Sequence, residues 1–148
     1  MEKACAIYEN LRIGGRTYAH EHNSYWTINI SLFHENKGIG YVQCLYFKEN
    51  KRLVIEDLNA HPEFHRKGLA TLQIASVLAF LKNEGLEIDT VVAEGVGCYS
   101  PEPEIKVGVE AFWSSLGFKS LGELDEWDVD SKTLETKLES KIAQKFGI

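Results

Sequence analysis

A chain of 148 residues, 44% of them hydrophobic, has the size of one domain with one core. Its formal net charge of −6 gives no electrostatic support to a nucleic-acid partner. No apolar run approaches the roughly 20 residues that cross a bilayer, and residues 1–12 are too polar for a secretory signal. Three widely spaced cysteines without a CxxC pair indicate free thiols. We therefore expect a cytoplasmic protein that binds neither nucleic acid nor a membrane.

The first third of the chain is predicted to form strands. Residues 3–8 fit a short strand or one turn of helix equally well, and Gly14-Gly15 indicates a turn. Alternating aromatic and β-branched residues predict three strands, over Tyr25–Phe33, Ile39–Lys48 and Leu53–Leu58. Because the turns between these strands are short and polar, we expect an antiparallel meander.

A long run of helix-forming residues follows the meander. It predicts a helix over Lys67–Asn83 with its C-cap near Gly85. Residues 88–94 come next and read as another strand. Since a helix precedes this strand, we expect it to run parallel to its neighbour in the sheet.

A loop is expected over residues 95–106, because Pro101 and Pro103 discourage regular structure there. A helix should follow and stop at Gly117. Residues 118–121 then fit a final short strand.

The last segment carries charge first and an apolar stripe afterwards. Residues 123–130 hold five carboxylates, which we interpret as solvated surface, with attraction of a cationic ligand as the alternative. Residues 131–146 predict a helix capped by Asp130 or Ser131. Its apolar side chains recur at every fourth position, namely Leu134, Leu138, Ile142 and Phe146. We expect a domain over 1–130 and a helical tail, 131–148, that packs on this domain or on a second subunit.

The junction between the third predicted strand and the long helix has the features of an anion site. Unpaired backbone N–H groups converge at the first turn of a helix, and the helix dipole favours phosphate there. Gly68 lets the backbone approach a ligand closely, and Arg66 and Lys67 add positive charge. The sequence therefore predicts a pyrophosphate site over residues 65–71.

These residues resemble a known motif. In the GNAT superfamily of acyl-CoA-dependent N-acyltransferases, the pyrophosphate loop reads Gln or Arg, two residues, Gly, one residue, then Gly or Ala. This chain has His65-Arg66-Lys67-Gly68-Leu69-Ala70. A second stretch, residues 109–118, resembles a later helix of the family that ends in Leu-Gly-Phe. The two stretches occur in the family's order, and together with the residues between them they cover about half of the chain.

The resemblance implies an α+β fold of GNAT type, with a mixed, mostly antiparallel sheet flanked by helices. Compared with the family, the N-terminal helical region is shortened, and an extra C-terminal helix replaces part of the usual closing hairpin. Acetyl-CoA is the implied cosubstrate. The implied contacts of its pantetheine arm are the backbone of Leu58, Asn59 and Ala60, where one amide would polarise the thioester carbonyl. The implied contacts of its diphosphate are His65, Arg66, Lys67, Gly68, Leu69, Ala70 and Thr71.

Glu56 and Asp57 are the candidate catalytic residues. Attack on a thioester needs a neutral amine, and a carboxylate can accept the amine proton directly or through water. Some family members that acetylate polyamines carry a similar Glu-Asp pair, so the resemblance makes Glu56 the base and Asp57 a group that positions the acceptor. Adjacent strand residues point to opposite faces unless a bulge intervenes. Two solvated carboxylates at a strand end are therefore the alternative.

No metal site is predicted, because His20 and His22 are close in sequence but lack a third ligand. Where many family members have a tyrosine thought to protonate the leaving thiolate, this chain has Trp113, whose indole N–H transfers no proton. Tyr99 is the nearest replacement by position. We expect direct acetyl transfer to a primary amine of a small polyamine-like or other cationic molecule. The alternatives are transfer to a protein lysine or N-terminus, and a module that binds acyl-CoA without turnover.

Overall fold

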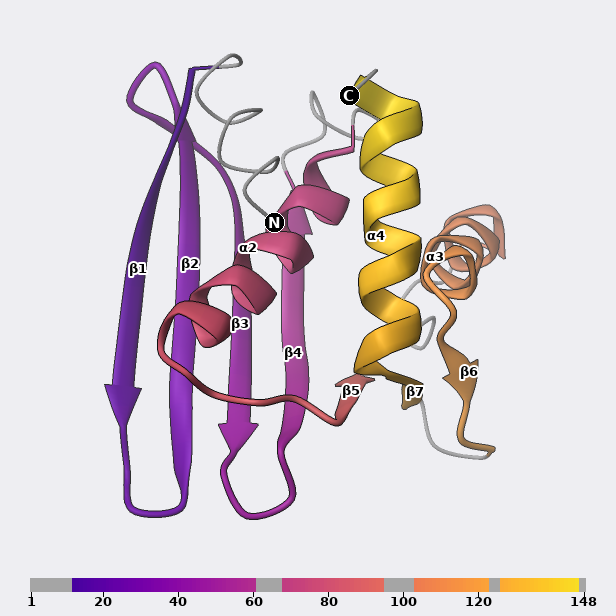
Figure 1. The fold of residues 1–148 in the computed structure, drawn as a ribbon. Coiled ribbons are helices and arrows are strands. Elements are labelled where there is room, and N and C mark those ends of the chain that lie inside the picture. The colour runs from indigo at the N-terminus through magenta and orange to yellow at the C-terminus, as the bar shows by residue number, and fades with distance from the viewer. Residues whose placement is uncertain (1–11, 61–67, 95–102, 123–125, 147–148) are drawn as a thin grey trace.

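The computed structural model of the chain describes residues 12–60, 68–94, 103–122 and 126–146. These residues form one seven-stranded sheet, in the order β1-β2-β3-β4-β5-β7-β6, and three helices that flank it (Figure 1). Only β4 and β5 are parallel neighbours, and the other pairs in this described sheet are antiparallel. The mixed, mostly antiparallel sheet expected from the sequence is confirmed.

The first four strands form an antiparallel meander, as predicted for the last three of them. Tight turns connect the strands, with positive φ angles at Glu35, Asn36 and Lys51. The four strands are β1 (Ile13–Glu21), β2 (Tyr25–His34), β3 (Lys37–Phe47) and β4 (Arg52–Ala60).

The turn predicted at Gly14-Gly15 is wrong, since both glycines lie inside β1. They stand opposite Phe33 and Leu32 of β2. A Cβ atom at position 15 would lie 3.5 Å from the side chain of Leu32, which is an ordinary van der Waals contact. Pairing along the whole of β2 therefore outweighs the local preference of glycine for turns. The open choice for residues 3–8 lies outside the described residues.

Helix α2 (Leu69–Asn83) crosses one face of the sheet and connects β4 to the parallel strand β5 (Thr90–Ala93) (Figure 1). Its buried side chains belong to one hydrophobic core with inward-facing residues of the meander. The core members include Ile28, Ile30, Val42, Leu53, Ile55, Ile74, Val77 and Leu81. The helix ends where predicted, just before Gly85 with its φ of 74°.

The C-terminal part differs from the expectation at two places. Helix α3 (Pro103–Ser115) begins at a proline, because the first helical residue needs no N–H partner. The predicted loop is therefore wrong for residues 103–106. Strand β6 (Lys119–Ser120) is not the last one, since β7 (Trp127–Asp130) pairs with it and with β5. Strand pairing places part of the acidic segment in the sheet, where Asp128 is half-buried and Asp130 is exposed.

Helix α4 (Ser131–Phe146) confirms the predicted cap and the first three residues of the predicted apolar stripe, while the side chain of Phe146 lies outside the described residues. Leu134, Leu138 and Ile142 are buried, with exposed fractions of 3% or less. The carboxylate of Asp130 accepts bonds from the backbone N–H and the hydroxyl of Thr133, at 2.9 and 2.7 Å. These bonds lower the pKa of Asp130. The helix lies beside α2, and its first two stripe leucines belong to the same core as the sheet.

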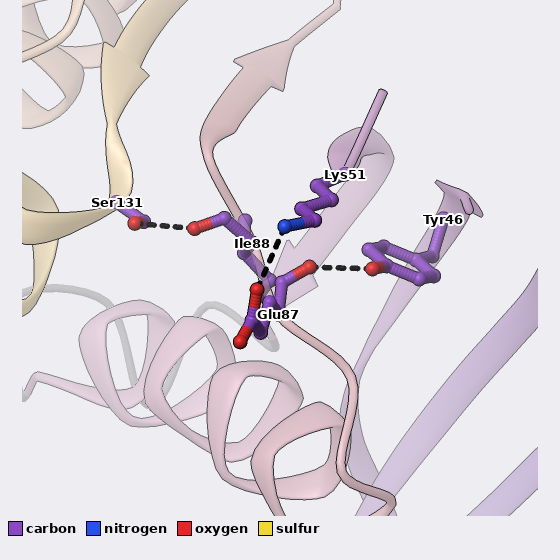
Figure 2. A network of polar contacts seen from close by, with 5 residues as sticks. All are labelled: Tyr46, Lys51, Glu87, Ile88 and Ser131. Carbon is purple, nitrogen blue, oxygen red and sulfur yellow. Dashed lines mark hydrogen bonds and ion pairs between the residues drawn. The ribbon is translucent and has the colours of Figure 1, made fainter. Parts of the chain in front are cut away.

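A polar network fixes the connection between α2 and β5 (Figure 2). The hydroxyl of Tyr46 donates to the backbone carbonyl of Glu87, and Lys51 Nζ lies 2.7 Å from the Glu87 carboxylate. This ion pair raises the pKa of Lys51 and lowers that of Glu87. The next carbonyl, of Ile88, accepts a 2.6 Å bond from the hydroxyl of Ser131. The connection between α2 and β5 is therefore bonded to β3, to the β3–β4 turn and to the start of α4.

Replacing Gly117 with alanine is expected to lower the free energy of unfolding by about 1–3 kcal/mol, measured by urea denaturation. Gly117 has a φ of 92°, and a Cβ there would lie 2.8 Å from Thr133 Cγ2 of α4. Gly85→Ala is the matched control, because Gly85 also has a positive φ but open space around it. Equal losses in the free energy of unfolding for the two variants would show that contact with α4 adds nothing to the cost of the alanine at position 117.

Candidate active site

Strand β4 extends beyond its parallel neighbour and leaves one edge open. It pairs with β5 only from Arg52–Thr90 to Ile55–Ala93, and one further bond joins the Glu94 N–H to the Ile55 carbonyl at 3.0 Å. From there to Ala60, the described part of the chain gives β4 a neighbouring strand on the β3 side only (Figure 1). Backbone groups on the other edge of this segment are therefore available to a ligand.

A β-bulge sits at the start of the open segment. Cys44 of β3 is opposite Ile55, and the adjacent Gln43 is opposite Asp57, so Glu56 is an extra residue in β4. This is the exception that the sequence argument allowed for two adjacent carboxylates. Glu56 is half-buried, and its charge adds to the burial that raises the pKa of the Cys44 thiol.

Asp57 faces the side of the sheet opposite α2. Its carboxylate accepts a 2.7 Å bond from the hydroxyl of Tyr41, and this bond raises the pKa of Tyr41. Tyr41 is therefore a neutral donor that holds the Asp57 carboxylate in one orientation. The structure places Glu56 and Asp57 side by side in β4, at the beginning of its open edge.

A third carboxylate joins this region, and the sequence analysis missed it. Glu94 directly follows β5, and partial desolvation raises its pKa, as do the charges of Glu56 and Glu126. The available signal was topological: parallel neighbours end at the same edge of a sheet, so residues after β5 approach the segment after Ile55. The three glutamates make this end of the sheet negative and favourable to a cationic ligand.

Replacing Glu94 with glutamine is expected to raise the thermal midpoint at pH 7 by about 1–2 °C and to change it less at pH 4. Folding raises the pKa of Glu94 above its ordinary value of 4.5, so the folded chain binds this proton more tightly than the unfolded chain. The ionised group therefore costs stability as the pH rises through the window above 4.5. Glu139→Gln on the exposed side of α4 removes the same charge and serves as the control. A midpoint that falls at pH 7 would contradict the expectation.

The N-terminus of α2 provides free backbone donors beside the open edge. Gly68 is its N-cap with a φ of 84°, and α2 has neither a side-chain cap nor an acidic residue in its first turn. The first intrahelical bond runs from the Leu72 N–H to the Gly68 carbonyl at 3.1 Å. The N–H groups of Leu69, Ala70 and Thr71 therefore have no partner within the helix. The side chains of Leu69 and Thr71 are buried, so in this first turn these two residues offer only their backbone to a ligand.

The two halves of the predicted coenzyme site are physically linked. Gln73 of α2 donates a 2.9 Å bond from Nε2 to the carbonyl of Asn59, close to the end of β4. Leu58, Asn59 and the backbone of Ala60 thus lie near the start of the helix that holds Gly68 to Thr71. His65, Arg66 and Lys67 lie outside the described residues, as does Tyr99.

Three other residues considered from the sequence make contacts with aromatic rings. Trp113 is 6% exposed and packs in the core, with its ring centroid 4.9 Å from that of Phe118. The rings of His20 and His22 lie 4.4 Å apart, and His22 stacks on Tyr25. Among the residues that the structure describes, no three His, Cys, Asp or Glu side chains form a group able to hold a metal.

None of the helices described is long and apolar enough to cross a membrane.

The sheet face opposite α2 carries a groove that the sequence analysis did not anticipate. Its volume is about 350 Å³, and Tyr18, His20, Thr27, Asn29 and Gln43 contribute to its lining. Most of this lining comes from β1 and β2, two described strands with no helix between them in the chain. Gln43 is the register partner of Asp57, so one end of the groove meets the candidate catalytic pair.

Comparisons with known proteins agree with this geometry. The family model "Acetyltransferase (GNAT) family" matches residues 3–99. PaiA N-acetyltransferase from Thermoplasma acidophilum, solved with coenzyme A, is 16% identical with a TM-score of 0.52; the match covers 69% of this chain and 59% of that one. A GNAT-family acetyltransferase from Staphylococcus aureus Mu50 is 9% identical with a TM-score of 0.55, covering 70% and 67%. Nourseothricin acetyltransferase is 16% identical with a TM-score of 0.51, covering 70% and 65%. No curated protein matches the chain.

A mixed sheet with an open β4 edge close to the start of the following helix is the arrangement that the resemblance to acyl-CoA-dependent acyltransferases implied. The family model covers well over half of the sequence. The chain belongs to the acetyltransferase (GNAT) family. The family recognised from the sequence is therefore confirmed; the match to the family model includes residues 65–70 and ends before 109–118, and its members are acetyltransferases.

Proposed function

We propose that this chain transfers the acetyl group of acetyl-CoA directly to a primary amine. The observation that carries the proposal is the meeting of the open β4 edge, from Glu56 to Ala60, with the uncapped start of α2. The backbone of Leu58 to Ala60 would bind the pantetheine arm, and the amides of Gly68 to Thr71 would bind the diphosphate. His65, Arg66 and Lys67 complete the proposed diphosphate site.

Glu56 is the proposed base. The amine nitrogen attacks the thioester carbonyl carbon, the new C–N bond forms and the C–S bond breaks. The proton that the amine loses passes to the Glu56 carboxylate, directly or through one water. The thiolate leaves without an acid, because thiols are already fairly acidic. A backbone N–H of the β4 end stabilises the charge that develops on the carbonyl oxygen.

The acceptor class that we propose first is a small cationic amine, such as a polyamine. Glu56, Glu94 and Glu126 support it, because their charges lie close enough to act on one another at the open end of the sheet. Asp57, held by Tyr41, would position the acceptor.

A lysine or N-terminus of a protein is the second candidate, and one observation favours it. The groove beside β1 opens directly onto the surface and reaches Gln43, next to Asp57. Its named lining carries hydroxyl, amide and imidazole groups rather than carboxylates, which suits a peptide better than a polycation.

A thiol-release assay with acetyl-CoA against simple amines, polyamines and lysine peptides tests the proposal. Release with a polyamine, unaffected by Gln43→Ala, would support the first acceptor class. Release with a lysine peptide, reduced several-fold by Gln43→Ala, would support the second. Binding of acetyl-CoA by calorimetry without release on any acceptor would reject the enzyme and support a module that binds acyl-CoA without turnover.

A further inference from the structure

We propose that Gln73 is a positioning residue for acetyl-CoA, acting through the backbone of Asn59. The inference rests on the proposed function. Gln73 is completely buried, with an exposed fraction of 0%. Its Nε2 donates the 2.9 Å bond that joins α2 to the carbonyl of Asn59.

Core packing alone does not explain a glutamine at this place. Its neighbours in α2, Leu72 and Ile74, are buried and apolar. The Oε1 atom of Gln73 has no hydrogen-bond partner within the described parts of the chain, and a buried polar atom without a partner costs stability. A leucine would occupy similar space without that cost. The function of the side chain therefore lies in the bond that Nε2 makes.

The bond from Gln73 fixes the position of more than the Asn59 carbonyl. Because Ile55 faces β5, the register across the bulge directs the backbone groups of Asn59 toward Tyr41 of β3 and those of Ala60 toward the open edge. The Asn59 carbonyl and the Ala60 N–H belong to one planar peptide unit, so fixing the carbonyl also fixes the Ala60 amide. The Ala60 amide lies on the edge of β4 that extends past β5, where backbone groups are open to a ligand. Gln73 thus holds the donor for the pantetheine arm in a constant relation to the helix start that receives the diphosphate.

The test is Gln73→Leu, with two ligands titrated by calorimetry. The first ligand is coenzyme A. The second is adenosine 3′-phosphate 5′-diphosphate, which keeps the nucleotide and the diphosphate but lacks the pantetheine arm. We expect the variant to bind coenzyme A about 5- to 20-fold more weakly and to bind the second ligand within about twofold of the parent chain. The thermal midpoint should not fall, because the variant replaces a buried polar group with an apolar one.

Val77→Ala provides the matched control, since Val77 is a fully buried residue of the same helix. It should lower the thermal midpoint and leave the ratio of the two affinities unchanged. Equal weakening of both ligands by Gln73→Leu would overturn the inference, because it would indicate a displaced helix rather than a displaced amide. Unchanged affinity for coenzyme A would also overturn it. A parent chain that binds neither ligand would reject the proposed function itself.

Discussion

Replacing Gly68 with glutamate is expected to abolish the binding of coenzyme A, with a loss of affinity of about 100-fold or more. Gly68 has a φ of 84°, which side chains other than hydrogen rarely accept, and it is the N-cap of α2. A glutamate there places a negative charge against the amides that would receive the diphosphate. Calorimetry with coenzyme A measures the loss.

Gly85→Glu is the control for this prediction. Gly85 follows the other end of the same helix, has a φ of 74° and is surrounded by open space. The control introduces the same charge and the same type of backbone strain, so it should lower stability while preserving affinity. The Gly68→Ala variant distinguishes backbone strain from charge repulsion, because it adds strain without charge. If the Gly68→Glu variant still bound coenzyme A, the diphosphate would not bind at the start of this helix.

Replacing Glu56 with glutamine is expected to lower kcat at pH 7 by about 100-fold or more while the affinity for acetyl-CoA stays unchanged. The glutamine keeps the size of the side chain at the β-bulge and cannot accept the amine proton. Because alkylamines are increasingly neutral above about pH 10, the deficit should shrink as the pH rises. Steady-state rates across this pH range measure both effects.

Asp57→Asn is the comparison for the same experiment, since the two carboxylates are adjacent but face different surroundings. Its partner is the hydroxyl of Tyr41, on the sheet face that carries the groove. We expect this variant to raise KM for the acceptor more than it lowers kcat. Full activity of Glu56→Gln at neutral pH would transfer the role of base to another group.

The parts of the fold that the sequence predicted are those with local signals. Strands β2 to β4 alternate with a period of two between polar turns, and α2 has a long run of helix formers before Gly85. The family motif at residues 65–70 is likewise contiguous and lies within the match to the family model. Local chemistry alone specifies these features, so one sequence was enough to find them.

The parts that were missed depend on partners distant in sequence. The glycines of β1 look like a turn until the whole of β2 is placed beside them. Strand β7 looks like a solvated acidic run until β5 and β6 flank it. The approach of Glu94 to Glu56, and the bond from Gln73 to Asn59, require the parallel crossover to be known first.

The extra residue in β4, Glu56, serves the proposed chemistry and is not needed for the pairing of the strands. Removing Glu56 would bring Ile55 and Asp57 next to each other, still opposite Cys44 and Gln43, so the β3–β4 ladder would become continuous. No side chain beyond the deletion would change the face to which it points. The sheet itself does not require this residue. A chain shortened by one position here would keep the same inward-facing surface and lose only the carboxylate proposed to take the proton.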